Sequence, residues 1–497
     1  MRTKNRVCFS ANEIITALTP FRILMPIAHF YTSKHFFMKG VRKMETKKTG
    51  FEVGAQQRES WFSITMVWAG AMICVSCLMV GGLLGSSLTL GQCALSILIG
   101  YSIIAAYMSL IGMQGSDLGL PTAVMAGSSL GEKGAQYIIS LLLAIACIGW
   151  FGVQSAVCGL SFSAMVDSIF GFHIPEWFSI IFWGAIMLLT ACYGFKGLKI
   201  LNIIAVPLLV IVCLYGLVLA VTQSEGLSVL AAYEPATNMG LVFGINFTIA
   251  TFALGGVISG DYCRFARTRG DVIKSSVLGV IPAGFIIMMI GAILTIVTGQ
   301  YDISLLFVSF GSVVLGLLGI LALISGTWTT NVTNAYTGGI SLSVLLGFDE
   351  SKRRIATGIA GSVGIIVALI GSLGAAGFYT MFQNFLSLLC ALIPPLAGTM
   401  IADYWIIGKG KKENFRIKPG FYIPGLIAFL LGVLAACITG GTFATYLPGL
   451  VATLPFLYIP FFVGPINGII VSLIAYAFLG KGSAQMAVET AMKKELT

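Results

Sequence analysis

The sequence has few charged residues and almost no histidine. Only 10% of its 497 residues are charged, whereas 57% are hydrophobic, and the histidines are His29, His35 and His173. Soluble proteins carry about 25% charged residues, so this composition excludes an ordinary soluble domain. The apolar residues form long runs rather than the short alternating segments of an outer-membrane barrel. The sequence therefore predicts an all-α polytopic membrane protein.

The long apolar runs also lack ionisable residues near their middle. The nearest carboxylates, Asp261 and Asp403, fall at the ends of two runs. Proton-driven pumps usually carry a relay of Asp, Glu or His inside the membrane, and a membrane enzyme needs catalytic groups or a metal set. We therefore expect no enzymatic activity and a neutral substrate. If transport is coupled to an ion, Na⁺ is favoured over H⁺.

The eleven cysteines are scattered and form no metal motif. Cys74 and Cys77 have the C-x-x-C spacing of a redox or metal pair, but no second pair or nearby histidine completes a metal site. The simpler interpretation is two small residues on one face of a helix.

Lysine and arginine are missing from six of the loops between the apolar runs. If twelve spans are drawn, all 29 Lys and Arg residues fall on one side, as the retention of positive charge in the cytoplasm requires. This pattern predicts a plasma (inner) membrane protein with both termini in the cytoplasm. Numbered in chain order, the predicted spans are 62–83, 92–113, 136–162, 177–194, 199–222, 239–259, 274–298, 308–339, 355–372, 378–404, 419–439 and 456–479.

These spans divide the chain into three parts. Residues 1–57 form a cytoplasmic N-terminal segment, of which 1–43 are expected to be a non-essential extension or, alternatively, a regulatory segment at the membrane surface. Residues 58–480 form the transmembrane domain, and 481–497 form a cytoplasmic tail. The turn-rich segment 114–134 is expected to run along the inner surface.

Spans one and six both contain glycine and other small residues near their middle, and span six begins five spans after span one. Interrupted helices at matching positions of two halves indicate a transporter built from inverted repeats. The alternative is close helix packing through small residues.

Polar and aromatic residues in three spans could form a site. Trp150 and Gln154 in span three are four residues apart and share a helix face, which suits a flat heterocycle that forms hydrogen bonds. In span six, Phe252 could cover the second face of such a ring, beside Thr251. The alternative is ordinary helix packing by these residues.

Span eight carries Gly326, Thr329 and Thr330. Two hydroxyls and one carbonyl at this spacing can approach one point, and two carbonyls from an interrupted span one would complete a five-oxygen Na⁺ site. Alternatively, the threonine hydroxyls bond back to carbonyls of their own helix.

The chain resembles the nucleobase:cation symporter family 1, particularly bacterial cytosine and purine–cytosine permeases. The resemblance covers about residues 52–480 and is carried by MVGGLLGSSL (79–88), IGWFGV (148–153), SGDYCRFAR (259–267), TWTTN (327–331) and IPPLAGTMIADYW (393–405). It implies ten core helices in two inverted five-helix repeats plus two peripheral helices, twelve transmembrane helices in all.

The resemblance also implies roles for single residues. Trp150 and Phe252 would hold the base between them, and Thr251 would contact it. The cation would be bound by the carbonyls of Gly70, Ile73 and Gly326 and the hydroxyls of Thr329 and Thr330. The predicted substrate-binding set is Trp150, Gln154, Thr251, Phe252, Gly255, Cys147, Cys74 and Asn331.

Two positions depart from the cytosine permeases of this family. Cys147 stands where they carry glutamine, and Gly326 stands where they carry asparagine, whereas Gln154 matches members that take hydantoins. The predicted function is import of a neutral nucleobase or related ring, such as a purine, allantoin or hydantoin, by cation symport. We expect no cofactor beyond the co-transported Na⁺ or H⁺, and no nucleic acid or obligate protein partner. The alternatives are an amino-acid transporter of related architecture and a non-transporting membrane sensor.

Overall fold

The computed structural model describes residues 53–193, 198–223, 227–299, 313–348, 352–374 and 377–495. The predicted extension 1–43 lies outside the described residues. The described part of the chain is almost entirely helical, and its β-structure is a single isolated bridge between Glu59 and Ala266. The prediction of an all-α membrane protein is confirmed.

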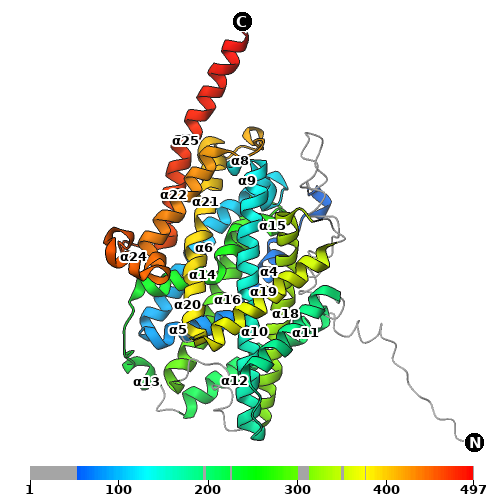
Figure 1. Cartoon of the computed structure of the whole chain (residues 1–497), viewed down its shortest axis with the longest axis vertical. Helices are drawn as coiled ribbons and strands as arrows, with labels where there is room; N and C mark the ends of the chain where they lie inside the picture. The colour runs from blue at the N-terminus through cyan, green and yellow to red at the C-terminus, as the bar shows by residue number, and fades with distance from the viewer. Residues whose placement is uncertain are drawn as a thin grey trace, which may run out of the picture.

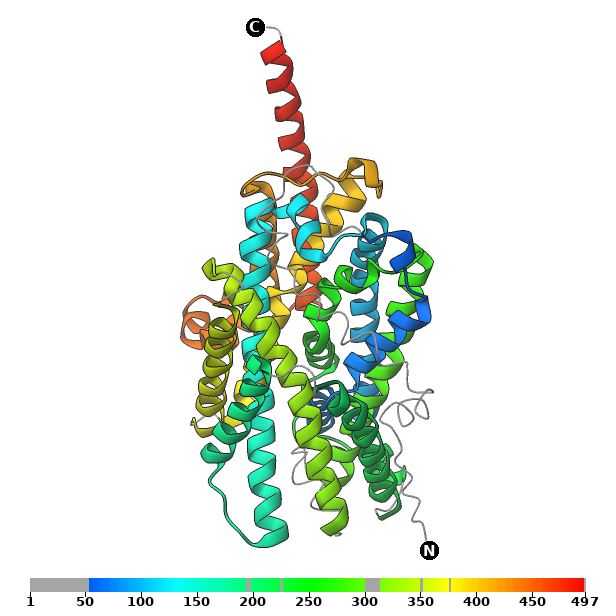
Figure 2. The ribbon, with the colours of Figure 1, turned by 90° about the vertical axis from the view of Figure 1, so that its right-hand side faces the viewer.

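Within the described residues, each predicted span contains a helix or a series of helices, and many of these run roughly along the long axis of the molecule (Figures 1 and 2). Seven helices of the described residues are long and apolar enough to cross a membrane, or eight if a bent pair counts as one span, so the number of twelve crossings stays a prediction. In chain order the elements are α4 (Trp61–Met72) with α5 (Val75–Ser87), α6 (Leu90–Leu118), α10 (Ser140–Phe170), α11 (Glu176–Tyr193), α12 (Leu198–Gln223), α14 (Leu241–Val257), α16 (Arg269–Thr298), α18 (Val313–Leu346), α19 (Arg353–Leu373), α20 (Gly377–Leu392) with α21 (Pro394–Ile401) and η5 (Ala402–Ile407), α22 (Ile423–Gly440) and α25 (Gly464–Glu495).

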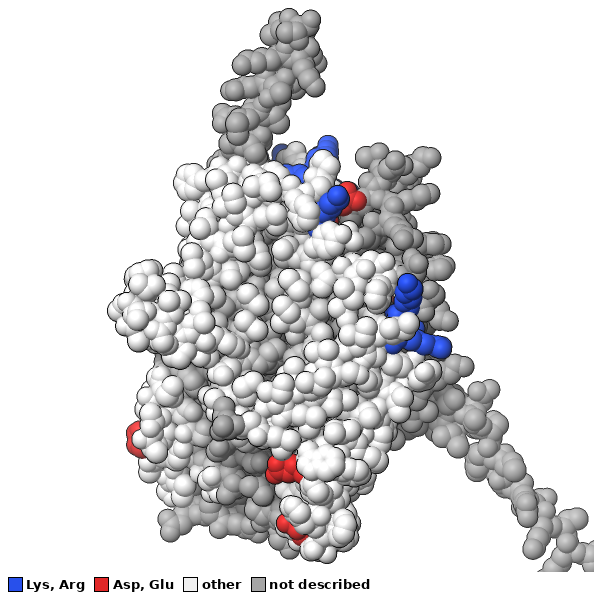
Figure 3. All heavy atoms as spheres, viewed as in Figure 1, with Lys and Arg blue, Asp and Glu red and all other residues white. Residues whose placement is uncertain are grey.

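Charged side chains are distributed unevenly along the long axis. On the face drawn in Figure 3, Lys and Arg lie in the upper part, toward the end where α25 leaves the bundle, whereas the lower end shows only Asp and Glu. Apart from these groups the surface on this face is uncharged, as expected of a membrane protein, and the orientation of the chain across the membrane stays a prediction.

A glycine seam joins the second half of span one to span seven. We use this name for Gly81 and Gly85 of α5 and Gly291 of α16, because a Cβ atom at any of them would overlap backbone atoms of the opposite helix. Gly279, further toward the start of α16, likewise faces Thr65 and Trp68 of α4. Small residues allow helix backbones to approach closely in membranes, so α16 supports both halves of span one.

The segment predicted to lie on the inner surface is buried. Residues 114–134 complete α6 and form the short helices α7 (Thr122–Met125), α8 (Gly127–Leu130) and α9 (Glu132–Gly134). The segment that precedes α22 covers these short helices. The Lys418 amide donates to the Gly127 carbonyl at 3.1 Å, and the Lys418 carbonyl accepts from the Glu132 amide at 2.8 Å. A partner about 290 residues away in sequence supplies this burial. The course of the segment along the inner side of the membrane stays a prediction.

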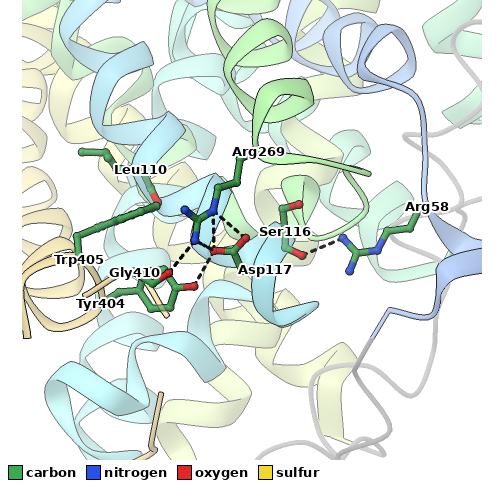
Figure 4. Close-up of polar contacts among 8 residues, drawn as sticks. All are labelled: Arg58, Leu110, Ser116, Asp117, Arg269, Tyr404, Trp405 and Gly410. Carbon is green, nitrogen blue, oxygen red and sulfur yellow. Dashed lines mark hydrogen bonds and ion pairs between the residues drawn. The ribbon is translucent and has the colours of Figure 1, made fainter. Parts of the chain in front are cut away.

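At the same end of the molecule, a polar cluster joins spans two, seven and ten (Figure 4). The Asp117 carboxylate accepts hydrogen bonds from Arg269 Nη2 at 2.6 Å and from the Tyr404 hydroxyl at 2.6 Å. Arg269 also donates to the Gly410 carbonyl at 2.7 Å. Arg58, just before α4, donates to two backbone carbonyls nearby. The cluster gives the buried Tyr404 a charged partner and fixes the end of span ten against spans two and seven.

Candidate substrate and cation site

Span one is broken in the middle, as predicted. α4 ends at Met72, α5 begins at Val75, and their axes differ by 58°. The Cys74 amide donates to the Met72 carbonyl at 3.0 Å instead of to Gly70, four residues back. As a result, the carbonyls of Gly70 and Ile73 accept no hydrogen bond from the described residues. Backbone oxygens in this state are available to a ligand.

The predicted oxygens of span eight lie next to this break. The Gly326 carbonyl accepts hydrogen bonds from Thr329 Oγ1 at 3.0 Å and from Thr330 Oγ1 at 3.1 Å. A Cβ atom on Gly326 would lie 3.3 Å from a methyl carbon of Val75, the first residue of α5. The hydrogen bonds within the helix and the predicted cation site involve the same oxygens. The two are compatible, because a hydroxyl that donates its hydrogen within the helix keeps lone pairs for a cation.

Span six is also interrupted, and the interruption lies at Phe252. This residue has φ −133° and ψ 17° inside α14, so the helix is kinked there. The Thr251 hydroxyl donates to the Thr248 carbonyl at 2.7 Å and lies 3.4 Å from the Tyr101 hydroxyl. The Phe252 ring packs edge-on against Trp68, with centroids 5.9 Å apart.

Gly255 lies directly under the Phe252 ring, and a Cβ atom there would overlap three ring carbons. We predict that Gly255→Ala displaces this ring and weakens substrate binding by about tenfold, a cost of about 1.4 kcal/mol. Binding is measured by substrate-induced thermal stabilisation of the purified protein. Gly358→Ala in α19 is the control, since nothing lies within 4 Å of a Cβ atom at that position. Equal affinity in the two variants would contradict the role of Phe252.

Trp150 and Gln154 share one face of α10, as their spacing predicts. Gln154 is 1% exposed, and its Oε1 has no hydrogen-bond partner among the described residues. Trp150 is half-buried and packs edge-on against Phe382 and Phe385 of α20, with centroids 6.2 and 5.3 Å apart. A buried amide oxygen without a partner is costly, so a ligand with an N–H group would stabilise this arrangement.

The two rings of the predicted sandwich do not touch. In the described part of the chain, Trp150 packs against rings of α20 and Phe252 packs against Trp68, with no ring contact between Trp150 and Phe252. A cavity of about 160 Å³ adjoins the Trp150 neighbours Phe382 and Phe385. Its lining is largely apolar. The sandwich therefore remains a prediction about the bound state.

The remaining predicted residues lie in different surroundings. Asn331 is fully buried, and its Nδ2 donates to the Phe151 carbonyl at 3.1 Å and to Ser155 Oγ at 3.0 Å, so it joins α18 to α10. Cys147 is buried and faces Gly338 of α18. Cys74 lies in the break of span one.

Sequence reasoning missed Trp68, Tyr101, Phe382 and Phe385, which surround the predicted residues. They carry no distinguishing signal, because aromatic side chains in apolar helices are usually packing residues. Asp261, which follows span six, is half-buried and accepts a hydrogen bond from the Thr122 amide at 2.7 Å. Burial raises the pKa of the Asp261 carboxyl, and the hydrogen bond and Arg264 oppose this rise.

Comparison with known proteins covers most of the chain. A family model described as a permease for cytosine/purines, uracil, thiamine and allantoin matches residues 52–464. The cytosine permease of Escherichia coli (strain K12) is 27% identical over 424 residues, which are 85% of this chain and 91% of that protein. The range matched by the family model includes all the residues of the candidate site.

Two solved structures of one protein have a similar fold. The inward-facing conformation of Mhp1 gives a TM-score of 0.71 at 19% identity and covers 86% of this chain and 92% of that one. Mhp1 is described as a nucleobase-cation-symport-1 family transporter. Its closed conformation with bromovinylhydantoin bound gives 0.66 at 20% identity, with 87% and 94% covered.

Proposed function

The chain belongs to the nucleobase:cation symporter family 1, the family of cytosine and purine permeases, and from this premise we propose that it imports a neutral planar heterocycle together with Na⁺. Members of this family are permeases, so the chain is a membrane transporter of nucleobase-like compounds and not an enzyme. The proposal places it in the plasma membrane with both termini in the cytoplasm.

One observation carries the cation part of the proposal. The hydroxyls of Thr329 and Thr330 in α18 each lie within 3.1 Å of the Gly326 carbonyl, beside a break in span one. The break leaves the carbonyls of Gly70 and Ile73 without partners in the described chain. Neutral backbone and hydroxyl oxygens at a discontinuous helix are typical Na⁺ ligands in transporters of this architecture.

The substrate part rests on Trp150, Gln154 and Phe252. A flat ring that stacks on the Trp150 indole presents its edge groups to Gln154, four residues along the same helix. The carboxamide can accept from a ring N–H and donate to a ring carbonyl, which a lactam offers side by side. Because Cys147 replaces the glutamine of cytosine permeases, hydantoin, allantoin or an oxopurine is favoured over cytosine.

Coupling follows from the position of the cation. A Na⁺ ion bound between the break and α18 would hold span one against span eight in the arrangement that shapes the ring site. Each ligand then raises the affinity for the other by the same factor, as thermodynamic linkage requires.

The test is uptake by proteoliposomes that contain only the purified chain. We predict that an inward Na⁺ gradient accelerates accumulation of a labelled hydantoin, allantoin or hypoxanthine by about tenfold over a choline gradient. Unlabelled hydantoins should compete, and leucine should not. Competition by leucine would instead indicate an amino-acid carrier. A response to a proton gradient but not to Na⁺ would contradict the proposed ion.

A further inference from the structure

We propose that Cys74 and Cys77 form a reversible oxidation site within the break of span one. Their sulfur atoms are 3.3 Å apart. A disulfide bond is about 2.05 Å long, so closing the pair needs a movement of little more than 1 Å. No other pair of cysteine sulfurs is in contact in the described part of the chain.

The local backbone places this dithiol at the start of a helix. Cys74 precedes the first residue of α5 in an extended conformation, with φ −142° and ψ 159°, and Cys77 is the third residue of the helix. A C-x-x-C pair in which the first cysteine begins a helix is the arrangement found in disulfide redox proteins. The break therefore makes these residues more than two small residues on a helix face.

Access and surroundings assign different roles to the two thiols. Cys74 is half-buried, whereas Cys77 is 2% exposed. Cys74 is therefore the thiol that a small oxidant reaches first, and Cys77 is the resolving thiol. The Tyr101 hydroxyl lies 3.9 Å from Cys77 Sγ and 3.4 Å from Thr251 Oγ1 of span six.

The oxidant is a small peroxide. The Cys74 sulfur attacks one oxygen of hydrogen peroxide and gives a sulfenic acid, while the other oxygen leaves as hydroxide and becomes water with the proton that the thiol gives up. The Cys77 sulfur then attacks the sulfenic sulfur, forms the S–S bond and releases a second water. Two thiols lose two electrons in total, and one peroxide is reduced to two water molecules. A dithiol reverses the reaction by exchange.

Oxidation would restrain the residues that the proposed transport cycle uses. The disulfide would fix the chain from Cys74 to Cys77, directly after Ile73, whose carbonyl is a proposed Na⁺ ligand. Conformational transitions commonly turn on a few hinge residues at the ends of helices, and a disulfide here would hinder such a turn at this break. This consequence rests on the proposed function, whereas the oxidation site itself does not.

The oxidation site is tested by mass spectrometry of the purified full-length protein. After treatment with hydrogen peroxide, we expect the peptide that contains Cys74 and Cys77 to lose two hydrogen atoms and to resist alkylation, and dithiothreitol to reverse both changes. Cys158, buried in α10, is the internal control and should keep a free thiol. Two free thiols at Cys74 and Cys77 after treatment that oxidises exposed thiols of the same sample would overturn the proposal.

The effect on transport is measured in proteoliposomes under the same treatment. Peroxide should lower uptake by about tenfold and dithiothreitol should restore it, whereas the Cys77→Ser variant should keep its uptake in peroxide. Equal inhibition of that variant would overturn the link between this disulfide and transport. Absence of uptake in the reduced protein would instead contradict the proposed function, and the mass measurement would still decide the oxidation site.

Discussion

Replacement of Trp150 by alanine is expected to weaken substrate binding by about 100-fold, which corresponds to about 2.7 kcal/mol. The variant removes the surface on which the ring is proposed to stack. Loss of a stacked aromatic contact costs about 0.5–1.5 kcal/mol beyond the apolar area that is re-exposed, and that area supplies the rest. The affinity is measured by substrate-induced thermal stabilisation and by competition in uptake.

A control separates stacking from packing, because Trp150 also contacts Phe382 and Phe385. Trp183 in α11 is another tryptophan held edge-on by neighbouring rings, with Phe162 at 5.3 Å and Trp328 at 6.2 Å. Trp183→Ala should lower the melting temperature without the loss of affinity. Trp150→Phe should keep part of the affinity. A near-normal affinity of Trp150→Ala would exclude the proposed stacking.

The second large effect is expected from simultaneous replacement of Thr329 and Thr330 by valine. Valine keeps the shape of threonine and removes the hydroxyl, so two of the five proposed Na⁺ ligands are lost. We predict that the Na⁺ concentration for half-maximal uptake rises by at least about tenfold, while substrate binding without Na⁺ changes little. Uptake is measured over a range of Na⁺ concentrations at constant ionic strength.

The matched control for this variant is Thr327→Val. The Thr327 hydroxyl is fully buried and donates to the Leu323 carbonyl at 2.7 Å, so it tests the loss of a hydroxyl that bonds back within the same helix. It should leave the Na⁺ dependence unchanged. If the double variant behaves like this control, the oxygens of Thr329 and Thr330 do not bind the ion.

The sequence alone is enough to predict the helices and to predict that spans one and six are interrupted. Charge distribution and apolar length locate the helices, and small residues near the middle of two matching spans indicate that both are interrupted; the structure places the breaks near Ile73 and Phe252. The spacing of Gly326, Thr329 and Thr330 also predicts their convergence, because all three are on one helix and its geometry fixes their separation.

Contacts between distant parts of the chain could not be predicted in this way. The burial of 114–134 depends on the segment around Lys418, and no local pattern indicates that partner. Asn331 looks the same in sequence whether its amide faces a substrate or donates to the Phe151 carbonyl, as it does here. The packing of Trp68 against Phe252 likewise depends on how α4 and α14 meet.

The glycine seam has a mechanical consequence. The seam holds α5 against α16 at Gly81, Gly85 and Gly291, whereas α4 meets α16 at Gly279, so an angular motion of α4 would part it from Gly279 and have its fulcrum at Ile73 and Cys74. α4 has 12 residues and forms an arm about 18 Å long at 1.5 Å per residue. A rotation of roughly 10° about that fulcrum moves the far end of the arm by about 3 Å. A single ion or a single covalent bond at the fulcrum can therefore govern a displacement large enough to open or close a passage for a small ring.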